Sequence, residues 1–270
     1  MPDGTVCRPM RISTAKLAMG AGKLLLPLLV LILWTTASRN EWVHPYLLPS
    51  PRRVGEAAWT LLYRGELIRH LGVSLRRVLT GFILTLGIAL PLSILIHFLG
   101  WLKNLTKGSL EFLRSIPPLS AIPLLILWFG IGEASKTAVI VMASFFPVFL
   151  NVLSGLDNVD ESWRELADSL QLTRRDYLAA VLIPAALPSI LTGIQLGISY
   201  SWRALMGAEM IAAASGIGYL ILDSQEMGRI DRVFVGILTL GICGILLDRV
   251  LMQLFNSWIP WLNLEEGRTW

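Results

Sequence analysis

Charge is scarce in this chain of 270 residues, and so are the side chains that most enzymes use for catalysis. Asp, Glu, Lys and Arg make up 16% of the residues, whereas a soluble globular domain carries roughly 25%. The two cysteines, Cys7 and Cys243, lie too far apart for a metal-ligand spacing or a disulfide framework. The sequence contains neither a His-Glu-x-x-His nor a Gly-x-x-x-x-Gly-Lys pattern. It therefore carries no signal of a zinc hydrolase, and ATP-driven work would need another chain as the motor.

Apolar residues account for 54% of the chain and lie in uncharged runs between charged clusters. A helix that crosses a bilayer needs about 20 mostly apolar residues, because each residue rises ~1.5 Å across a ~30 Å hydrocarbon core. The runs predict an all-α, polytopic membrane protein with about six transmembrane helices. Their approximate ranges are 17–37, 78–100, 116–129, 137–153, 187–208 and 233–254. The third range contains Pro117, Pro118 and Pro123, so we expect that helix to be broken at its start.

These spans divide the chain into a cytoplasmic N-terminal segment (1–16), a transmembrane domain (17–258) and a cytoplasmic tail (259–270). Six spans place both termini on the same side as a charged segment at 157–183. Lys and Arg favour the cytoplasm in short loops, and they fit this orientation everywhere except in the arginine-rich first connection. The charge rule is therefore indecisive, and the orientation rests mainly on the charged segment. Part of that connection, 54–79, has helical spacing, and we expect an amphipathic helix on the outer membrane surface.

The charged stretch 157–177 interrupts the apolar sequence with helix-forming residues. Three capping-box patterns begin at Asn158, Ser162 and Thr173. They predict two short helices separated near 171–172, and we expect Pro184 and Pro188 to end the second. A loop with its own fold indicates a surface that a partner contacts. A solvated connector whose charges only keep it soluble remains an equal alternative on these grounds.

The sequence Glu165-Leu166-Ala167, followed by the Leu-Ile-Pro that ends at Pro184, resembles the EAA signature of permease subunits in ATP-binding-cassette importers. In that family the segment is the coupling helix, which sits in a cleft of the ATPase subunit on the cytoplasmic face. The resemblance implies an ATPase-coupling role for Glu165, Leu166, Ala167, Gln171 and Pro184. Leu166 replaces the usual central Ala, and Gln171 stands where Gly is usual.

Further stretches are similar to the sulfonate/taurine/nitrate branch of these permeases. They are 48–51, 114–118, 122–136, 145–151, 202–205, 208–210 and 215–221. The resemblance covers about 43–258 and implies the type I importer permease fold in the bacterial inner membrane. It also implies a homodimer in contact with membrane lipid, two cytoplasmic ATPase subunits that bind the ATP, and an extracytoplasmic substrate-binding protein. The permease itself would hold no cofactor. An aliphatic sulfonate, taurine or nitrate is the implied substrate, and bicarbonate or a pyrimidine or vitamin precursor remains the alternative.

Two ionisable residues in the fifth predicted span or at its outer end, Arg203 and Glu209, are candidates for the substrate pathway, because charges at membrane depth are costly. Arginine donates several hydrogen bonds to planar oxyanions such as nitrate or sulfonate. The alternative is structural pairing, with a partner elsewhere because six residues do not share one helical face. Further candidates, for which packing or simple kinking is the alternative, are Trp202, Trp128, Pro117 and Pro118.

Three other classes of protein fit the sequence less well. A secondary transporter predicts an inverted repeat and buried acids that carry ions, but the two halves are not similar and the spans hold few acids. An intramembrane enzyme needs a nucleophile and a base at one depth, whereas His44, His70 and His97 are scattered. The net charge of +4 reflects Lys and Arg beside the helices rather than a nucleic-acid surface.

Overall fold

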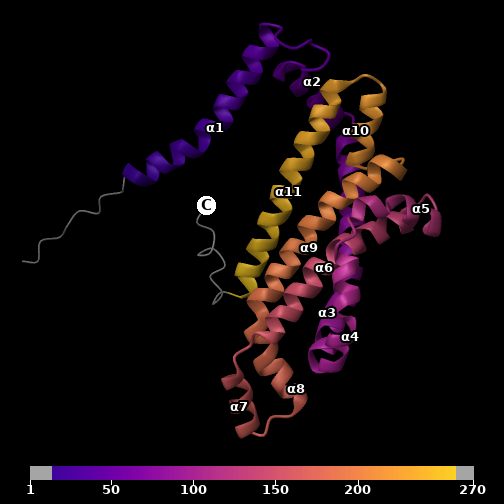
Figure 1. Ribbon diagram of the computed structural model, residues 1–270. Coiled ribbons are helices and arrows are strands. Elements are labelled where there is room, and N and C mark those ends of the chain that lie inside the picture. The colour runs from indigo at the N-terminus through magenta and orange to yellow at the C-terminus, as the bar shows by residue number, and fades with distance from the viewer. Residues whose placement is uncertain (1–13, 260–270) are drawn as a thin grey trace, which may run out of the picture.

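The computed structural model describes residues 14–259, which form helices joined by short links (Figure 1). Each crossing segment is a helix because only internal hydrogen bonds satisfy a backbone that lies in hydrocarbon. Within the described residues, four helical segments are long and apolar enough to cross a membrane. They are α3 (Glu66–Phe98), α6 (Glu133–Asp157), the segment Arg174–Ala212 that contains α9 (Ile183–Ala212), and α11 (Ile230–Trp258).

The third predicted span is broken, as expected from its prolines. Helix α4 (Gly100–Arg114) is followed by a single turn, η1 (Pro118–Ala121), and by α5 (Ile122–Phe129). The two halves of this pair bend by 82°. Pro117 and Pro118 lack the N–H that would continue α4, and Pro117 adopts an extended conformation. Eight residues of α5 reach only about 12 Å, so the pair forms one broken span or a re-entrant loop, and the number of spans rises to at most five.

Helix α1 (Thr14–Arg39) stands where the first span was expected, and its described apolar part, Leu25–Arg39, is shorter than a full span. Figure 1 shows α1 extending away from the other helices and approaching them near its C-terminal end. There Trp34 donates its indole N–H to the carbonyl oxygen of Pro49 at 3.0 Å and stacks on Phe234 of α11. The apolar side chains from Leu25 to Leu33 are exposed.

The prediction of one amphipathic helix over 54–79 is wrong. Helix α2 (Pro51–Tyr63) ends just before Gly65, whose φ of 71° lies in the left-handed region that glycine favours. A new helix, α3, begins at Glu66 and runs without a break into the membrane. The later arginines of this connection therefore lie on a spanning helix and not on a surface helix.

Helices α6 and α9 pack closely, and α3 packs against α6. Glycines at the contacts allow the close approach that packing in a membrane requires. A Cβ added at Gly197 of α9 would lie 2.5 Å from Val148 Cγ2 of α6 and 2.8 Å from Phe82 Cε2 of α3. The short helix α10 (Ile217–Glu226) connects α9 to α11 and lies at the end of the bundle opposite α7 (Figure 1).

The expectation that Pro184 and Pro188 end a helix is also wrong. Helix α8 (Arg174–Tyr177) continues through a π turn, η2 (Leu178–Leu182), directly into α9. The N–H of Ile183 bonds the carbonyl oxygen of Leu178, one residue further back than in an α-helix. This wider turn makes room for the ring of Pro184, which would clash with the preceding turn of a regular helix.

Candidate functional site

The charged stretch after α6 folds into α7 (Glu161–Ser169) and α8, and both helices have capped N-termini. The cap of α7 is Asp160, which accepts a hydrogen bond from the backbone N–H of Ser162 at 2.9 Å. The predicted caps at Asn158 and Ser162 are therefore wrong, since the chain enters the helix between them. The predicted cap of α8 is confirmed, because Thr173 Oγ1 accepts from the N–H of Asp176 at 3.3 Å.

Helix α7 ends in a turn that Gln171 closes. Gln171 has a φ of 51°, the left-handed conformation that glycine adopts most easily. The N–H of Leu172 bonds the carbonyl of Ala167, and the N–H of Gln171 bonds that of Asp168, each at 3.0 Å. These are the two bonds of a Schellman motif. The substitution of Gln for the usual Gly therefore keeps the turn, at a backbone strain of about 1–2 kcal/mol.

Three large apolar side chains of α7 are exposed in the described structure. Trp163, Leu166 and Leu170 each expose about half of their surface or more, and Glu165 beside them is exposed as well. Ala167 is the buried residue of the helix. Apolar residues gathered on a short, otherwise charged helix are typical of surfaces that contact a partner.

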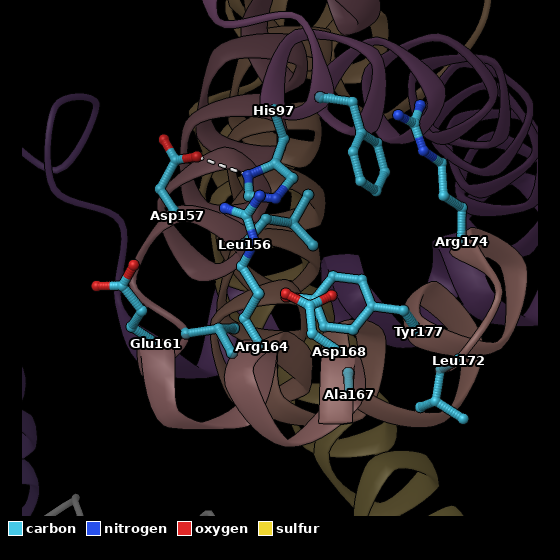
Figure 2. Close-up of a pocket in the computed structure, with 12 residues that line it drawn as sticks. His97, Leu156, Asp157, Glu161, Arg164, Ala167, Asp168, Leu172, Arg174 and Tyr177 are labelled. Carbon is cyan, nitrogen blue, oxygen red and sulfur yellow. Dashed lines mark hydrogen bonds and ion pairs between the residues drawn. The ribbon is translucent and has the colours of Figure 1, made fainter. Parts of the chain in front are cut away.

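A cavity of about 630 Å³ lies between α7 and the ends of the spanning helices. Figure 2 shows Arg164 and Asp168 of α7 pointing into it, opposite His97 and Asp157. Asp157, the last residue of α6, accepts from Lys103 Nζ of α4 at 2.6 Å, and its other oxygen lies 2.7 Å from Nδ1 of His97 on α3. One carboxylate thus ties the ends of three helices together where the chain leaves for α7.

The two charged pathway candidates lie apart and do not pair. Glu209 is fully buried and accepts hydrogen bonds from Arg77 Nη1 at 2.8 Å, from Ser74 Oγ at 2.9 Å and from the N–H of Gly218 at 3.0 Å. Its partner therefore comes from α3. Sequence reasoning missed Arg77 because it placed that residue on a surface helix, although its position at the border of a long uncharged run was a usable signal.

Arg203 is exposed and lines a cavity of about 430 Å³ between α9 and α11. Its guanidinium lies over the ring of Tyr200, 5.7 Å from the centroid. In the same cavity Gln195 Nε2 donates to Asp248 Oδ1 at 2.6 Å. Tyr200 also lines a second cavity, of about 340 Å³, on the side of the broken span. Sequence reasoning missed Tyr200, although its spacing of three residues from Arg203 places both on one helical face.

The remaining candidates fall into different environments. Trp202 is buried and donates its indole N–H to the carbonyl oxygen of Leu240 at 3.1 Å, so it packs α9 against α11. Trp128 is largely exposed near the end of α5. Pro117 and Pro118 form the bend of the broken span, and Pro118 lines the cavity of about 340 Å³. Among residues 14–259, no group of His, Cys, Asp or Glu side chains could hold a metal ion.

Comparison with known proteins identifies relatives over most of the chain. The family described as "Binding-protein-dependent transport system inner membrane component" matches residues 81–259. A Bacillus subtilis relative named as the aliphatic sulfonates transport permease SsuC is 35% identical over 90% of this chain and 88% of its own length. The taurine transport system permease TauC of Escherichia coli is 32% identical, and the nitrate import permease NrtB of Synechocystis is 30% identical. Each of these two alignments covers 86% of both chains.

The fold is similar to that of a solved chain from the inward-facing MetNI methionine ABC transporter. The TM-score is 0.55 at 15% sequence identity, over 68% of this chain and 95% of the other. At this identity the likeness concerns the fold alone, and it confirms the fold that the sequence resemblance implied.

Proposed function

The chain belongs to the family of binding-protein-dependent transport system inner membrane components, and we propose that two copies of it form the membrane pathway of an importer for small oxyanions. As a permease subunit of an ABC importer, it is a multi-pass inner-membrane protein and not itself an enzyme. Separate cytoplasmic subunits bind and hydrolyse the ATP, and a binding protein delivers the substrate from the other side. Helix α7 and the C-terminal end of α11 face the cytoplasm.

The observation that supports this proposal best is the construction of α7. It is capped by Asp160, closed by Gln171, and carries an exposed apolar face. A helix of this kind fits a cleft of an ATPase subunit, with Leu166 and its apolar neighbours in contact and Glu165 at the rim. Helix α8 continues through η2 and past Pro184 into α9, which carries Arg203. A displacement of α8 therefore reaches α9 without an intervening loop.

The substrate class is supported by the relatives and by the chemistry of the Arg203 cavity. The relatives are named for aliphatic sulfonates, taurine and nitrate. These substrates share a compact oxyanion group, which a guanidinium binds through parallel N–H···O hydrogen bonds. Arg203 is exposed to a cavity between two spanning helices, beside Tyr200 and Gln195. We place the anion contact of the pathway there.

The test is ATP-driven uptake of radiolabelled taurine and of nitrate by proteoliposomes that contain this chain with its ATPase subunits and binding protein. The substitution Glu165→Lys reverses a charge on α7 and should release the ATPase subunits and abolish uptake, while membrane insertion stays intact. The matched control is Glu111→Lys, which reverses an exposed charge on α4 and should leave uptake unchanged. If the ATPase subunits still co-purify with the Glu165→Lys variant and still drive uptake, the role of α7 is wrong.

A further inference from the structure

A chain of ion pairs joins α3, α6 and α9 at the ends of α6 and α9 that are remote from α7. Arg77 Nε and Nη2 donate to the two carboxylate oxygens of Glu133 at 2.8 and 2.6 Å. Arg77 Nη1 donates to Glu209 Oε1 at 2.8 Å and to the carbonyl oxygen of Ser215 at 2.6 Å. The side chain of Arg77 is 5% exposed and that of Glu209 is 0% exposed. The guanidinium is thus buried, and oxygens of Glu133, Glu209 and Ser215 accept its hydrogen bonds.

Glu133 differs from the other members of this chain of ion pairs because its side chain is 54% exposed. It lines a cavity of about 400 Å³ together with Arg77 and Lys136, and the link from α9 to α10 lines the cavity as well. Lys136 is 4% exposed, and its Nζ lies 3.6 Å from Glu133 Oε1. Two buried cations therefore meet a carboxylate that reaches them from the open side.

The contact between Arg77 and Glu133 has the geometry of an anion-recognition site. A guanidinium binds a carboxylate through two parallel N–H···O bonds, and the same fork matches two oxygens of a sulfonate or a nitrate. Solvent reaches the half-exposed Glu133 carboxylate from the cavity, so an anion that enters the cavity can exchange with it without opening the protein. The buried cations, in contrast, need an anion beside them at all times, since an unpaired buried charge is costly.

We propose that this cavity is an oxyanion subsite at the extracytoplasmic mouth of the pathway, and that the Glu133 carboxylate holds the place of the substrate between transport events. An arriving sulfonate or nitrate accepts the two parallel hydrogen bonds from Arg77 Nε and Nη2, and the Glu133 carboxylate rotates into the solvent. The charge beside Arg77 and Lys136 stays the same during this exchange. Glu209 remains bonded to Arg77 throughout and keeps the guanidinium oriented toward the cavity. The proposal rests on the import function stated above.

The test is binding of methanesulfonate and of nitrate to the detergent-solubilised complex of this chain with its ATPase subunits, without the binding protein. Affinity is read from the thermal shift at constant ionic strength. Glu133→Gln removes the internal competitor, so the apparent Kd should fall by a factor of about five or more, the factor that corresponds to ~1 kcal/mol of competing ion-pair energy. A Kd that is unchanged or higher in this variant overturns the proposal.

Two further variants separate displacement from simple charge repulsion. Glu133→Asp keeps the charge but shortens the side chain, so the fork is lost and the Kd should fall here too, whereas repulsion alone predicts no change. Glu66→Gln removes a charge at the start of α3, about 16 Å along the helix from Arg77 and beyond the ~8 Å screening length. Its Kd should stay at the wild-type value. If the wild-type protein takes up the anions but Glu133→Gln leaves the Kd unchanged, the subsite alone is refuted. If the wild-type protein takes up neither anion, the proposed function is refuted.

Discussion

Arg77 of α3 and Glu209 of α9 form an ion pair of 2.8 Å in which the carboxylate is fully buried. Arg77→Met would leave this carboxylate without a counter-ion, which should lower the free energy of unfolding by about 3–5 kcal/mol. Glu209→Gln keeps the shape and leaves Arg77 paired with Glu133, so the loss should be smaller, about 1–3 kcal/mol. Thermal unfolding of the solubilised protein measures both. An Arg77→Met variant that is as stable as Glu209→Gln would contradict the assigned pairing.

The close packing of the first turn of α10 against α9 should tolerate no side chain at Gly218. A Cβ there would lie 2.6 Å from the carbonyl oxygen of Met206 and 2.7 Å from Glu209 Cβ. Neither atom can move freely, so Gly218→Ala should destabilise the protein by about 1–3 kcal/mol. The control is Gly72→Ala on α3, where no atom lies within 4 Å of the added methyl group. It should be neutral or stabilise by up to about 1 kcal/mol through helix propensity, as judged by the same unfolding measurement.

The turn after α7 should become more stable when glycine replaces Gln171. Glycine removes the strain of the left-handed conformation but adds backbone entropy to the unfolded chain, so the expected net gain is about 0.5–1 kcal/mol. Hydrogen exchange at the amides of Gln171 and Leu172, which close the turn, should slow a few-fold. Gln171→Ala serves as the control and should bring no gain. Faster exchange in the glycine variant would show that the Gln side chain itself stabilises the turn.

The N-terminus of α7 should fray in acid. The N–H of Ser162 bonds the Asp160 carboxylate and lowers its pKa. A carboxyl group whose folded pKa is depressed stabilises the fold above its unfolded pKa, near 3.9, and loses this effect as the pH falls through the folded pKa. Exchange of the Ser162 amide, corrected for its intrinsic rate, should therefore accelerate below about pH 4. Asp160→Asn keeps the cap without the charge, so that variant should show no such pH dependence.

Local signals in the sequence were sufficient for several of these features. The prolines at 117–118 predicted the break between α4 and α5, because a missing N–H acts on the residues next to it. The charged stretch after Asp157 predicted the two short helices, and the cap at Thr173 was found where the pattern placed it. Each of these signals depends on a few neighbouring residues, which is why sequence reasoning reached them.

The features that sequence reasoning missed depend on groups far apart in the chain or on a compensating turn. The partner of Glu209 lies 132 residues away, and no spacing rule connects the two. Pro184 should have ended a helix by local rules, but the π turn before it absorbed the steric conflict. Gly65 divided a continuous helical pattern because the left-handed turn available to it outweighed the periodicity on both sides.

The guanidinium of Arg203 should be required for anion uptake and dispensable for folding. Arg203→Gln removes a charged hydrogen-bond donor from its cavity, so uptake of taurine and of nitrate should fall about tenfold at subsaturating concentration. Arg203→Lys keeps the charge but loses the paired N–H donors of the guanidinium, so its uptake should lie between those of Arg203→Gln and the wild type. The matched control is Arg249→Gln on α11, which removes an exposed cation that does not line the Arg203 cavity. Basal ATP hydrolysis and the unfolding temperature should stay unchanged in all three variants. If Arg203→Gln transports at the wild-type rate, its guanidinium does not contact the anion, and the stacking on Tyr200 is its whole role.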